Sequence, residues 1–288
     1  MKELKIFSVI AIFTAVLYWG VEPLAHSVFH PGLHEKQPDF SFSDLKGVDT
    51  SLTGDATAGQ DVITSNCTAC HSITSQGFEA PMDDQSSADS YGVVPPDLSS
   101  AGYLYDAKYL ANFMKNPAHA AKVEHKFNDN RPYPMSSFDY LSDQELMDGV
   151  AYLQSIAPKE MSNEDAFKDS CSRCHAMRYA KIHAKTDPVN LKNYMGSVPP
   201  DLSQMIRSRG EHYLNVFVNN PQETLHGTAM PRVGLNEKAQ EQVISYLEEV
   251  GDSKKKEREE LAPWVLGYLF IFTFFAYLWK RKVWSEVH

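Results

Sequence analysis

Cysteine is scarce in this chain of 288 residues, which contains only four. The sequence also has no segment whose alternation of apolar and polar residues predicts a β-strand. The cysteines fall into two pairs, so none is left over for a structural disulfide. Positive charge is also in deficit, since 27 lysine and arginine residues face 37 acidic ones, a formal net charge of −10. Such a balance argues against nucleic acid as a partner and predicts a surface that steers basic partners. A role in solubility alone would explain the charge equally well.

An internal repeat with an offset of 104 residues divides the chain into two similar halves. Hydrophobic residues make up 43 % and charged residues 22 % of the chain, which indicates a folded protein of about two domains. The recurring stretches are Cys67-Thr68-Ala69-Cys70-His71 with Cys171-Ser172-Arg173-Cys174-His175, Val94-Pro95-Pro96-Asp97-Leu98-Ser99 with Val198-Pro199-Pro200-Asp201-Leu202-Ser203, and Tyr109-Leu110, Phe113 and Asn116-Pro117 with Tyr213-Leu214, Phe217 and Asn220-Pro221.

Helical patterns begin and end each half. Short helices are expected over 59–66 and 163–170, before the cysteine pairs, and amphipathic helices over 143–156 and 237–250. Pro158 follows the helix expected over 143–156 and ends it. The halves diverge in one place, because 18 residues separate Pro117 from Met135 but only 9 separate Pro221 from Met230. The first half therefore carries an excursion of nine extra residues.

Two apolar runs lie near the ends of the chain. Ile6 to Val21 follows Lys2 and Lys5, as in a signal peptide or a signal anchor, and the absence of a convincing small-x-small cleavage site favours an uncleaved anchor. Ala262 to Trp279 has 18 residues without a charge. At about 1.5 Å per residue this run nearly spans a hydrocarbon core of ~30 Å. The alternative is a buried core helix.

The tryptophans favour membrane helices. All four lie at the ends of the apolar runs or just beyond them, at positions 19, 264, 279 and 284, as in the aromatic belts of membrane proteins. Pro263 is expected in the first turn of the second span, where proline is tolerated. Lysine and arginine residues flank both ends of this span, so charge alone leaves its orientation ambiguous.

The two Cys-x-x-Cys-His motifs predict covalent attachment of two haem c groups. Two thiols about one helical turn apart can add to both vinyl groups of one porphyrin, and the next residue then offers its imidazole to the iron. The predicted attachment residues are Cys67, Cys70, Cys171 and Cys174, with His71 and His175 as iron ligands. A zinc site or a redox dithiol are the alternatives, but zinc ribbons space their cysteine pairs roughly 15–20 residues apart, and a dithiol does not explain two matching histidines.

Met135 and Met230 are the predicted ligands on the opposite face of each iron. Each lies beside a proline, after the Asn-Pro end of a helix and before the last helix of its half. A thioether ligand favours reduced iron and raises the potential. The alternatives are that these methionines fill the core, or that His119, His125 or His226 takes their place.

The Pro-Pro-Asp-Leu repeats have a predicted role on the histidine side. The carbonyl groups of Pro96 and Pro200 are candidates to accept the Nδ1–H of the ligand histidines and so fix their rings. The same prolines also make rigid turns that cannot continue a helix, and the two roles are compatible.

The second half resembles cytochrome c1 over most of 167–280. The resemblance rests on Cys171-Ser172-Arg173-Cys174-His175-Ala176-Met177-Arg178-Tyr179, on Pro199-Pro200-Asp201-Leu202-Ser203 with Arg209-Gly210-Glu211-His212-Tyr213, on Ala229-Met230-Pro231, and on the C-terminal apolar run. Ordinary cytochrome c1 has one haem and a long excursion before its methionine, whereas this chain has two motifs and no such excursion in its second half. The chain looks most like the di-haem cytochrome c1 subunits of some bacterial quinol–cytochrome c reductases.

This resemblance implies an all-α fold with two tandem class I cytochrome c domains between two transmembrane helices. The expected divisions are an N-terminal transmembrane anchor at 1–24, cytochrome c domains at 50–158 and 161–251, and a C-terminal transmembrane helix at 261–280. Haem attachment to such motifs takes place outside the cytoplasm in bacteria, which predicts periplasmic haem domains, an inner-membrane location and two cytoplasmic termini.

By the same resemblance, electrons come from a Rieske iron–sulfur protein in a complex with cytochrome b and go to a soluble cytochrome c or a terminal oxidase. No catalytic residue is expected on this chain, since the resemblance implies that the quinol site lies on another subunit. The alternatives are a di-haem subunit of a terminal oxidase, a free-standing membrane electron shuttle, and a di-haem peroxidase. An oxidase subunit typically has its anchors before both haem domains, and a peroxidase needs an open iron position.

Overall fold

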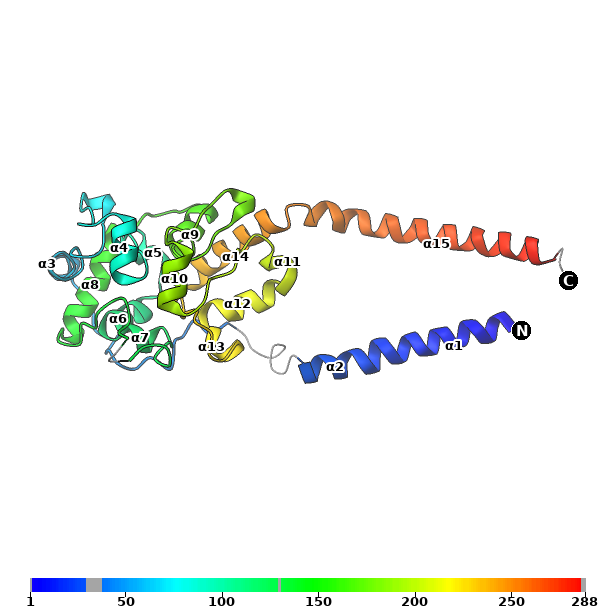
Figure 1. Cartoon of the computed structure of the whole chain (residues 1–288), viewed down its shortest axis with the longest axis horizontal. Coiled ribbons are helices and arrows are strands. Elements are labelled where there is room, and N and C mark those ends of the chain that lie inside the picture. The colour runs from blue at the N-terminus through cyan, green and yellow to red at the C-terminus, as the bar shows by residue number, and fades with distance from the viewer. Residues whose placement is uncertain (1, 30–37, 129–130, 286–288) are drawn as a thin grey trace.

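The computed structural model describes residues 2–29, 38–128 and 131–285. Met1 of the predicted anchor and residues 129–130 of the predicted first domain lie outside these ranges. Within them the chain is helical, and only isolated β-bridges join its extended segments, so the predicted all-α fold class is confirmed. The elements, most of them labelled in Figure 1, are α1 Lys2–Val16, the π-helical turn Leu17–Val21, α2 Glu22–Phe29, α3 Ala56–Asn66, the 3₁₀ turn Thr74–Gln76, α4 Asp84–Tyr91, α5 Ala101–Leu104, α6 Ala107–Lys115, α7 Pro117–Ala120, α8 Asp143–Ile156, α9 Asn163–Ser170, the 3₁₀ turn Arg178–Ala180, α10 Pro188–Met195, α11 Met205–Arg209, α12 Glu211–Asn219, α13 Pro221–Thr224, α14 Glu237–Gly251 and α15 Lys255–Ser285.

Side-chain caps fix the ends of the main helices. Ser142 begins α8 with a capping box, in which its hydroxyl accepts from the Glu145 N–H and the Glu145 carboxylate accepts from the Ser142 N–H. Ser162 is the N-cap of α9 and Asn236 is the N-cap of α14. The side chain of each accepts one hydrogen bond from the backbone N–H three residues later. The bounds of α8 and α9 are those expected from sequence, and α14 runs one residue further than expected, to Gly251.

The first half is built on the crossing of α3 and α8. The helices approach so closely that a Cβ on Gly59 would lie 1.9 Å from the carbonyl oxygen of Asp148. Only glycine permits this approach, since any other residue would push the backbones apart. Around the crossing lies the first core, which includes Ile63, Leu146 and Val150, each at most 1 % exposed.

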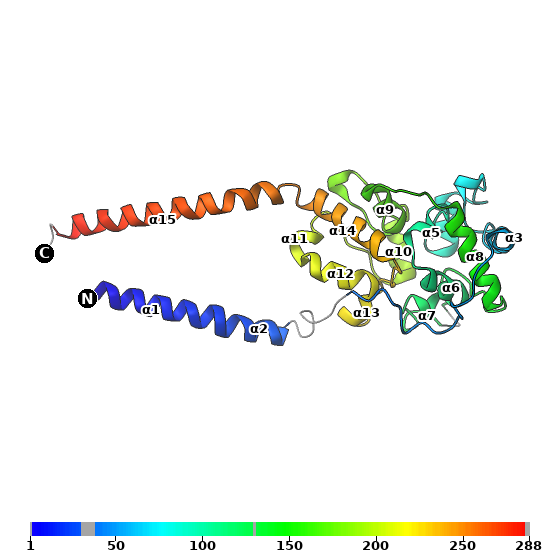
Figure 2. The ribbon, with the colours of Figure 1, turned by 180° about the vertical axis from the view of Figure 1, so that it is seen from behind.

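The second half repeats this plan with α9 and α14. The rings of Phe167 and Tyr246 pack at a centroid distance of 5.2 Å, and Phe167 is fully buried. Leu104, at the end of α5 in the first half, belongs to the core of the second half. The backbone also connects the halves, because the Asn236 N–H donates to the Leu104 carbonyl at 2.9 Å. The two halves therefore pack as one body, which Figure 2 shows from behind.

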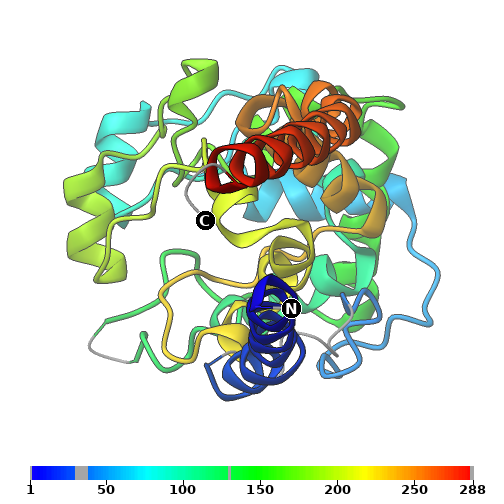
Figure 3. The same cartoon turned by 90° about the vertical axis from the view of Figure 1, so that its right-hand side faces the viewer.

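Two long apolar helices leave the same end of this body and run side by side (Figures 1 and 3). The helix over 3–29 and α15 are both long and apolar enough to cross a membrane, and neither is covered by the rest of the chain. Near their far ends the Lys280 Nζ lies 2.6 Å from the Glu3 Oε1. The predicted pair of terminal helices is thus confirmed in length and composition.

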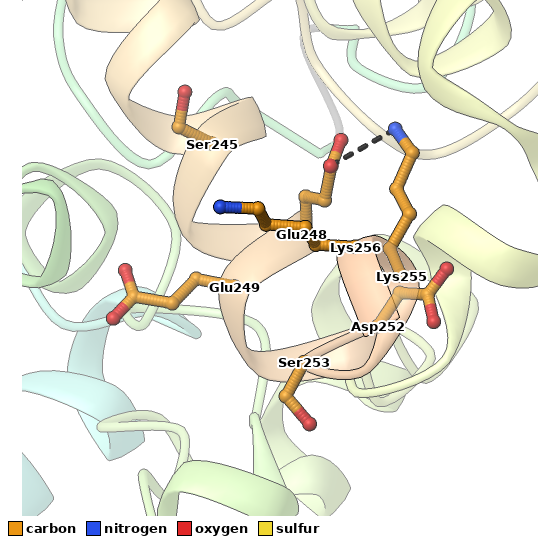
Figure 4. A pocket seen from close by; sticks show the side chains of 7 residues that line it. All are labelled: Ser245, Glu248, Glu249, Asp252, Ser253, Lys255 and Lys256. Atoms are coloured by element: carbon orange, nitrogen blue, oxygen red, sulfur yellow. Dashed lines mark ion pairs between the residues drawn. The ribbon is translucent and has the colours of Figure 1, made fainter. Parts of the chain in front are cut away.

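The second of these helices starts earlier than the sequence suggested. Pro263 is its ninth residue and not part of its first turn, because the charged stretch after Lys255 is already helical. Ion pairs stabilise the join with α14: the Arg258 Nη1 lies 2.7 Å from the Asp252 Oδ1, and the Lys255 Nζ lies 2.9 Å from the Glu248 Oε1. Figure 4 shows the Lys255–Glu248 pair beside a shallow, charged surface hollow at this join.

Candidate haem sites

Each cysteine pair lies on a tight turn that continues directly from a helix. The Cys67 carbonyl accepts the N–H groups of Cys70 at 3.1 Å and of His71 at 2.9 Å. The Cys171 carbonyl accepts those of Cys174 and His175 at the same two distances. The buried faces of α3 and α9 pack against the two cores. Each helix therefore positions the motif that follows it in the same way.

The histidine of each motif is held by the predicted proline carbonyl. The His71 Nδ1 lies 2.7 Å from the Pro96 oxygen, and the His175 Nδ1 lies 2.9 Å from the Pro200 oxygen. Donation from Nδ1 fixes the tautomer and leaves Nε2 with a free lone pair. Burial lowers the pKa of both imidazoles, although the hydrogen bonds to the prolines oppose that shift. The neutral imidazole is the form that binds a metal.

The aspartates after these prolines explain why the sequence repeats Pro-Pro-Asp-Leu-Ser. Asp97 accepts from the Ser99 N–H at 2.7 Å and from the Ser72 hydroxyl at 3.0 Å, which ties the proline segment to the residue after His71. In the second half Asp201 accepts from the Ser203 N–H at 3.0 Å and from the Arg178 N–H at 3.1 Å. Each aspartate thus stabilises the loop that aims the proline carbonyl at its histidine.

None of the four cysteines is in a disulfide, and burial disfavours the thiolate form of Cys67, Cys171 and Cys174. Burial raises the pKa of the Cys67 thiol to about 12 and that of the Cys171 thiol to about 11. Reactive dithiols and zinc ligands need the thiolate, which burial disfavours at these three cysteines. Within the described ranges, no group of three or more histidine, cysteine, aspartate or glutamate side chains could hold a metal ion. The alternatives of a zinc site and a redox dithiol therefore lose support.

The same residues fit a haem c. Each site offers two neighbouring thiols for thioether bonds and one neutral imidazole whose Nδ1 is already oriented. In each half these groups come from one continuous turn. This donor set matches a porphyrin that supplies four of the iron ligands itself and needs only axial ligands from the protein.

The two methionines lie in different surroundings. Met135 is half-buried and packs against the first core, while Met230 is half-buried on the segment between α13 and α14. The rival histidines are on the surface: the His119 Nδ1 lies 3.1 Å from the exposed Glu124 carboxylate, and His125 and His226 are exposed. Burial thus favours the methionines over the histidines.

The two sites lie next to each other, and no sequence pattern predicts this. Ser100 donates to the Asp169 carboxylate at 2.7 Å, just before the second motif. The segment Pro95–Asp97 of the first site and Arg173 of the second line one small hollow, together with Lys168, Asp169 and Lys185. An arginine inside a cysteine motif gave no sequence signal, because the variable positions of that motif accept many residues.

The nine-residue excursion also has a place that the sequence did not suggest. It packs against α10 of the second half, where the rings of Phe127 and Tyr194 lie 5.5 Å apart. Arg131 stands over both rings, at 6.0 and 5.7 Å from their centroids, and its guanidinium donates to the Asn193 carbonyl at 2.9 Å. The excursion therefore fixes the second half relative to Tyr133 and Met135, which follow it.

Comparison with known proteins gives three similarities. The family model for cytochrome c matches residues 56–157 and again residues 164–251. A cytochrome c of Tetrahymena pyriformis is 28 % identical over 108 residues, which cover 36 % of this chain and 90 % of that protein. A chain from a structure titled "Hyperthermophilic respiratory Complex III" is 20 % identical with a TM-score of 0.33, covering 44 % of this chain and 75 % of that one.

Proposed function

This chain belongs to the cytochrome c family, and from that premise we propose that it is the di-haem, c1-type subunit of a quinol–cytochrome c reductase. Membership implies covalently bound haem c and electron transfer, since the bound haem supplies the one-electron iron chemistry. The proposal adds that there are two haems, one on each motif. The observation that carries it is the repeated arrangement in which a Cys-x-x-Cys-His turn has its histidine Nδ1 bonded to a proline carbonyl, at 2.7 Å in the first half and 2.9 Å in the second.

In this proposal each residue has one task. The thiols of Cys67 and Cys70, and in the second half of Cys171 and Cys174, hold the porphyrins through thioether bonds. His71 and His175 bind iron through Nε2 while Pro96 and Pro200 fix their rings. Met135 and Met230 complete the ligation and favour the reduced state. The haems would supply the one-electron chemistry, and the proposal assigns no catalytic residue to this chain because the resemblance implies a quinol site on another subunit.

The contacts between the halves support electron transfer from one haem to the other. The segment that holds His71 lines the same small hollow as Arg173, which stands between the two cysteines of the second motif. The Ser100–Asp169 hydrogen bond and the packing of the excursion on α10 connect the two halves beside this hollow. A close arrangement of two redox sites lets an electron pass without a domain movement.

The two apolar helices support a membrane location with both ends of the chain on one side. Both leave the same end of the haem-binding body and run side by side, so the body lies on one side of a membrane and the two termini on the other (Figure 1). Because c-type haems are attached outside the cytoplasm, we infer that the body is periplasmic and the termini cytoplasmic. The proposed electron donor is a Rieske protein associated with cytochrome b, and the acceptor is a soluble cytochrome c or a terminal oxidase.

Purification of the tagged chain from its native membrane in mild detergent tests the proposal. Cytochrome b and a Rieske iron–sulfur protein should co-purify in constant ratio with the chain, and the complex should oxidise a quinol with reduction of both haems. Co-purification with the subunits of an oxygen-reducing oxidase, or purification of the chain alone with both haems intact, would contradict it.

A further inference from the structure

The two halves bury the same segment to different extents. Val94, before the prolines of the first half, is 4 % exposed, and its N–H donates to the Thr186 hydroxyl of the second half at 3.0 Å. Val198 occupies the same place 104 residues later and is 51 % exposed. The second domain therefore covers this face of the first haem site, whereas the same face of the second haem site is open.

The charges of these two segments are opposite. Residues 67–96 contain four acidic residues and no lysine or arginine, a formal charge of −4. The equivalent residues 171–200 contain five basic residues and one acidic residue, a formal charge of +4. In a chain with a net charge of −10, the segment that carries His175 thus has a local excess of positive charge. The basic side chains that are exposed are Arg178, Lys181, Lys185 and Lys192.

Exposed apolar side chains accompany this positive charge. Tyr179, Val189 and Val198 are 59 %, 63 % and 51 % exposed. We call the segment 176–200 that carries these groups the basic loop. Its ends meet at the second haem site, because the Leu202 N–H donates to the Ala176 carbonyl at 2.9 Å and the Pro200 oxygen lies 2.9 Å from the His175 Nδ1. The basic loop therefore encloses one side of that site.

Part of the basic loop lies on a flank of the molecule, away from the apolar helices. Seen from the end that carries both termini, α10 lies at one edge of the body beside α4 (Figure 3). The Asn190 amide donates to the Asp89 carboxylate of α4 at 2.9 Å, which confirms that the two helices are neighbours. A surface on this flank lies away from the apolar helices, where a protein in solution can reach it.

We propose that the basic loop is the docking surface for an electron acceptor whose redox cofactor is surrounded by carboxylates. One electron passes from the reduced iron held by His175 to the oxidised cofactor of that protein, and no atom is transferred. The Debye length is about 10 Å at 0.1 M salt, so a docking partner feels the four exposed cations of the loop together with the nearby Asp187 and Asp89, and these six charges leave a local excess of positive charge. The exposed apolar groups exclude water at the contact, as in the centre of protein interfaces. This inference rests on the proposed function only in requiring a haem at His175.

The experiment measures electron transfer from the full-length, haem-loaded chain in nanodiscs of zwitterionic lipid. The reduced chain is mixed by stopped flow with oxidised plastocyanin, a carboxylate-rich copper protein, and separately with lysine-rich mitochondrial cytochrome c. The test variant is Lys181→Glu with Lys192→Glu. The matched control is Lys46→Glu with Lys159→Glu, which makes the same change in net charge at exposed lysines outside the basic loop.

The wild type should reduce plastocyanin at a rate that falls as salt is added. The test variant should be slower by about tenfold or more at low salt, and the control by much less, because local charges steer association. The test variant should lose no rate toward the lysine-rich cytochrome c. Equal losses in both variants, or a wild-type rate independent of salt, would overturn the proposal. Self-association of the chain that the test variant abolishes would assign the loop to a second copy and overturn it too.

Failure of the proposed function would be seen separately. A chain with fewer than two covalent haems, or one whose second haem is not reduced by dithionite, would contradict the proposed function before any docking measurement. If both haems can be reduced but the rate of plastocyanin reduction does not depend on Lys181 and Lys192, only the proposed docking surface is contradicted.

Discussion

Arg232 and Asp44 form an ion pair between positions 188 residues apart, with the Arg232 Nη2 3.0 Å from the Asp44 Oδ2. Arg232 is 2 % exposed, and its Nε also donates to the Asn219 carbonyl at 3.1 Å. Its guanidinium carbon lies 5.5 Å from the ring centroid of Phe42, which is itself buried. Because Arg232 follows Met230 by two residues, this pair fixes the proposed ligand segment of the second half to the chain that precedes the first half.

Replacement of Arg232 by alanine should destabilise the protein by about 1–3 kcal/mol, because it leaves the buried acceptors of Asn219 and Asn220 without their donor. Chemical unfolding followed by the Soret band measures this. Arg207→Ala is the matched control, since its side chain is 61 % exposed and lies 3.9 Å from Asp252. An ion pair whose arginine is this exposed contributes about 0–1 kcal/mol. Equal losses for the two variants would show that the burial of Arg232 gives it no special role.

The same ion pair predicts a pH dependence. Burial alone would raise the pKa of Asp44, but the hydrogen bond and charge of Arg232 outweigh it, so the pKa lies below the ordinary 3.8. A carboxyl with a lowered folded pKa stabilises the protein above its unfolded pKa, and this is lost as the pH falls through the folded value. Asp44→Asn should therefore lower the unfolding temperature at pH 7, and the difference should shrink below about pH 4. A difference that stays constant down to pH 2 would contradict this assignment.

Local signals allowed much of the helical framework to be predicted. The amphipathic pattern and Pro158 predict the bounds that α8 has in the structure, and the structure adds the capping box of Ser142 and Glu145. The histidine–proline pairs could be predicted because the Cys-x-x-Cys-His motif and the Pro-Pro-Asp-Leu-Ser stretch both recur at an offset of 104 residues. The shared offset indicates that the two stretches act together in each half. Both sets of signals lie within one half of the repeat.

The contacts between the halves could not be predicted in this way. Arg131 stands over the ring of Tyr194, 63 residues away, and neither residue has a counterpart in the other half that would mark it. The burial of Val94 and the exposure of Val198 depend on how two similar domains pack, and their sequences around the prolines are the same. Pro263 was expected at a helix start because proline is common there, but the charged turn before it is also helical.

Replacement of Gly59 by alanine should disrupt the first half selectively. The added Cβ would lie 1.9 Å from the Asp148 carbonyl oxygen, which belongs to the backbone of α8 and cannot rotate away. The helices must separate, at a cost of roughly 1–3 kcal/mol or more. Thermal melting and the haem content of the purified variant measure the effect. Gly267→Ala in α15 is the control, since nothing lies within 4 Å of its Cβ, and it should behave as wild type.

The haem count is predicted to be two per chain. A pyridine haemochrome assay on acid-acetone-washed protein should give this value for the wild type, since each half has a complete attachment turn. Cys67→Ala with Cys70→Ala should give one covalent haem, and so should Cys171→Ala with Cys174→Ala, because each half has its own core. Wild-type protein with one haem, or haem that the wash extracts, would contradict the prediction.

The last prediction concerns the proposed distal ligands. Oxidised wild-type protein should show the weak sulfur-to-iron charge-transfer band, and Met135→Ala and Met230→Ala should each remove part of it. Met230→His should lower the potential of one haem and leave its attachment intact, because the thioether bonds do not involve this side chain. Met161→Ala is the control, since Met161 packs against the second core and should leave the band unchanged. If Met135→Ala left both the band and the two redox transitions unchanged, the first haem would have another ligand, and His125, exposed on the excursion, would be the next residue to replace.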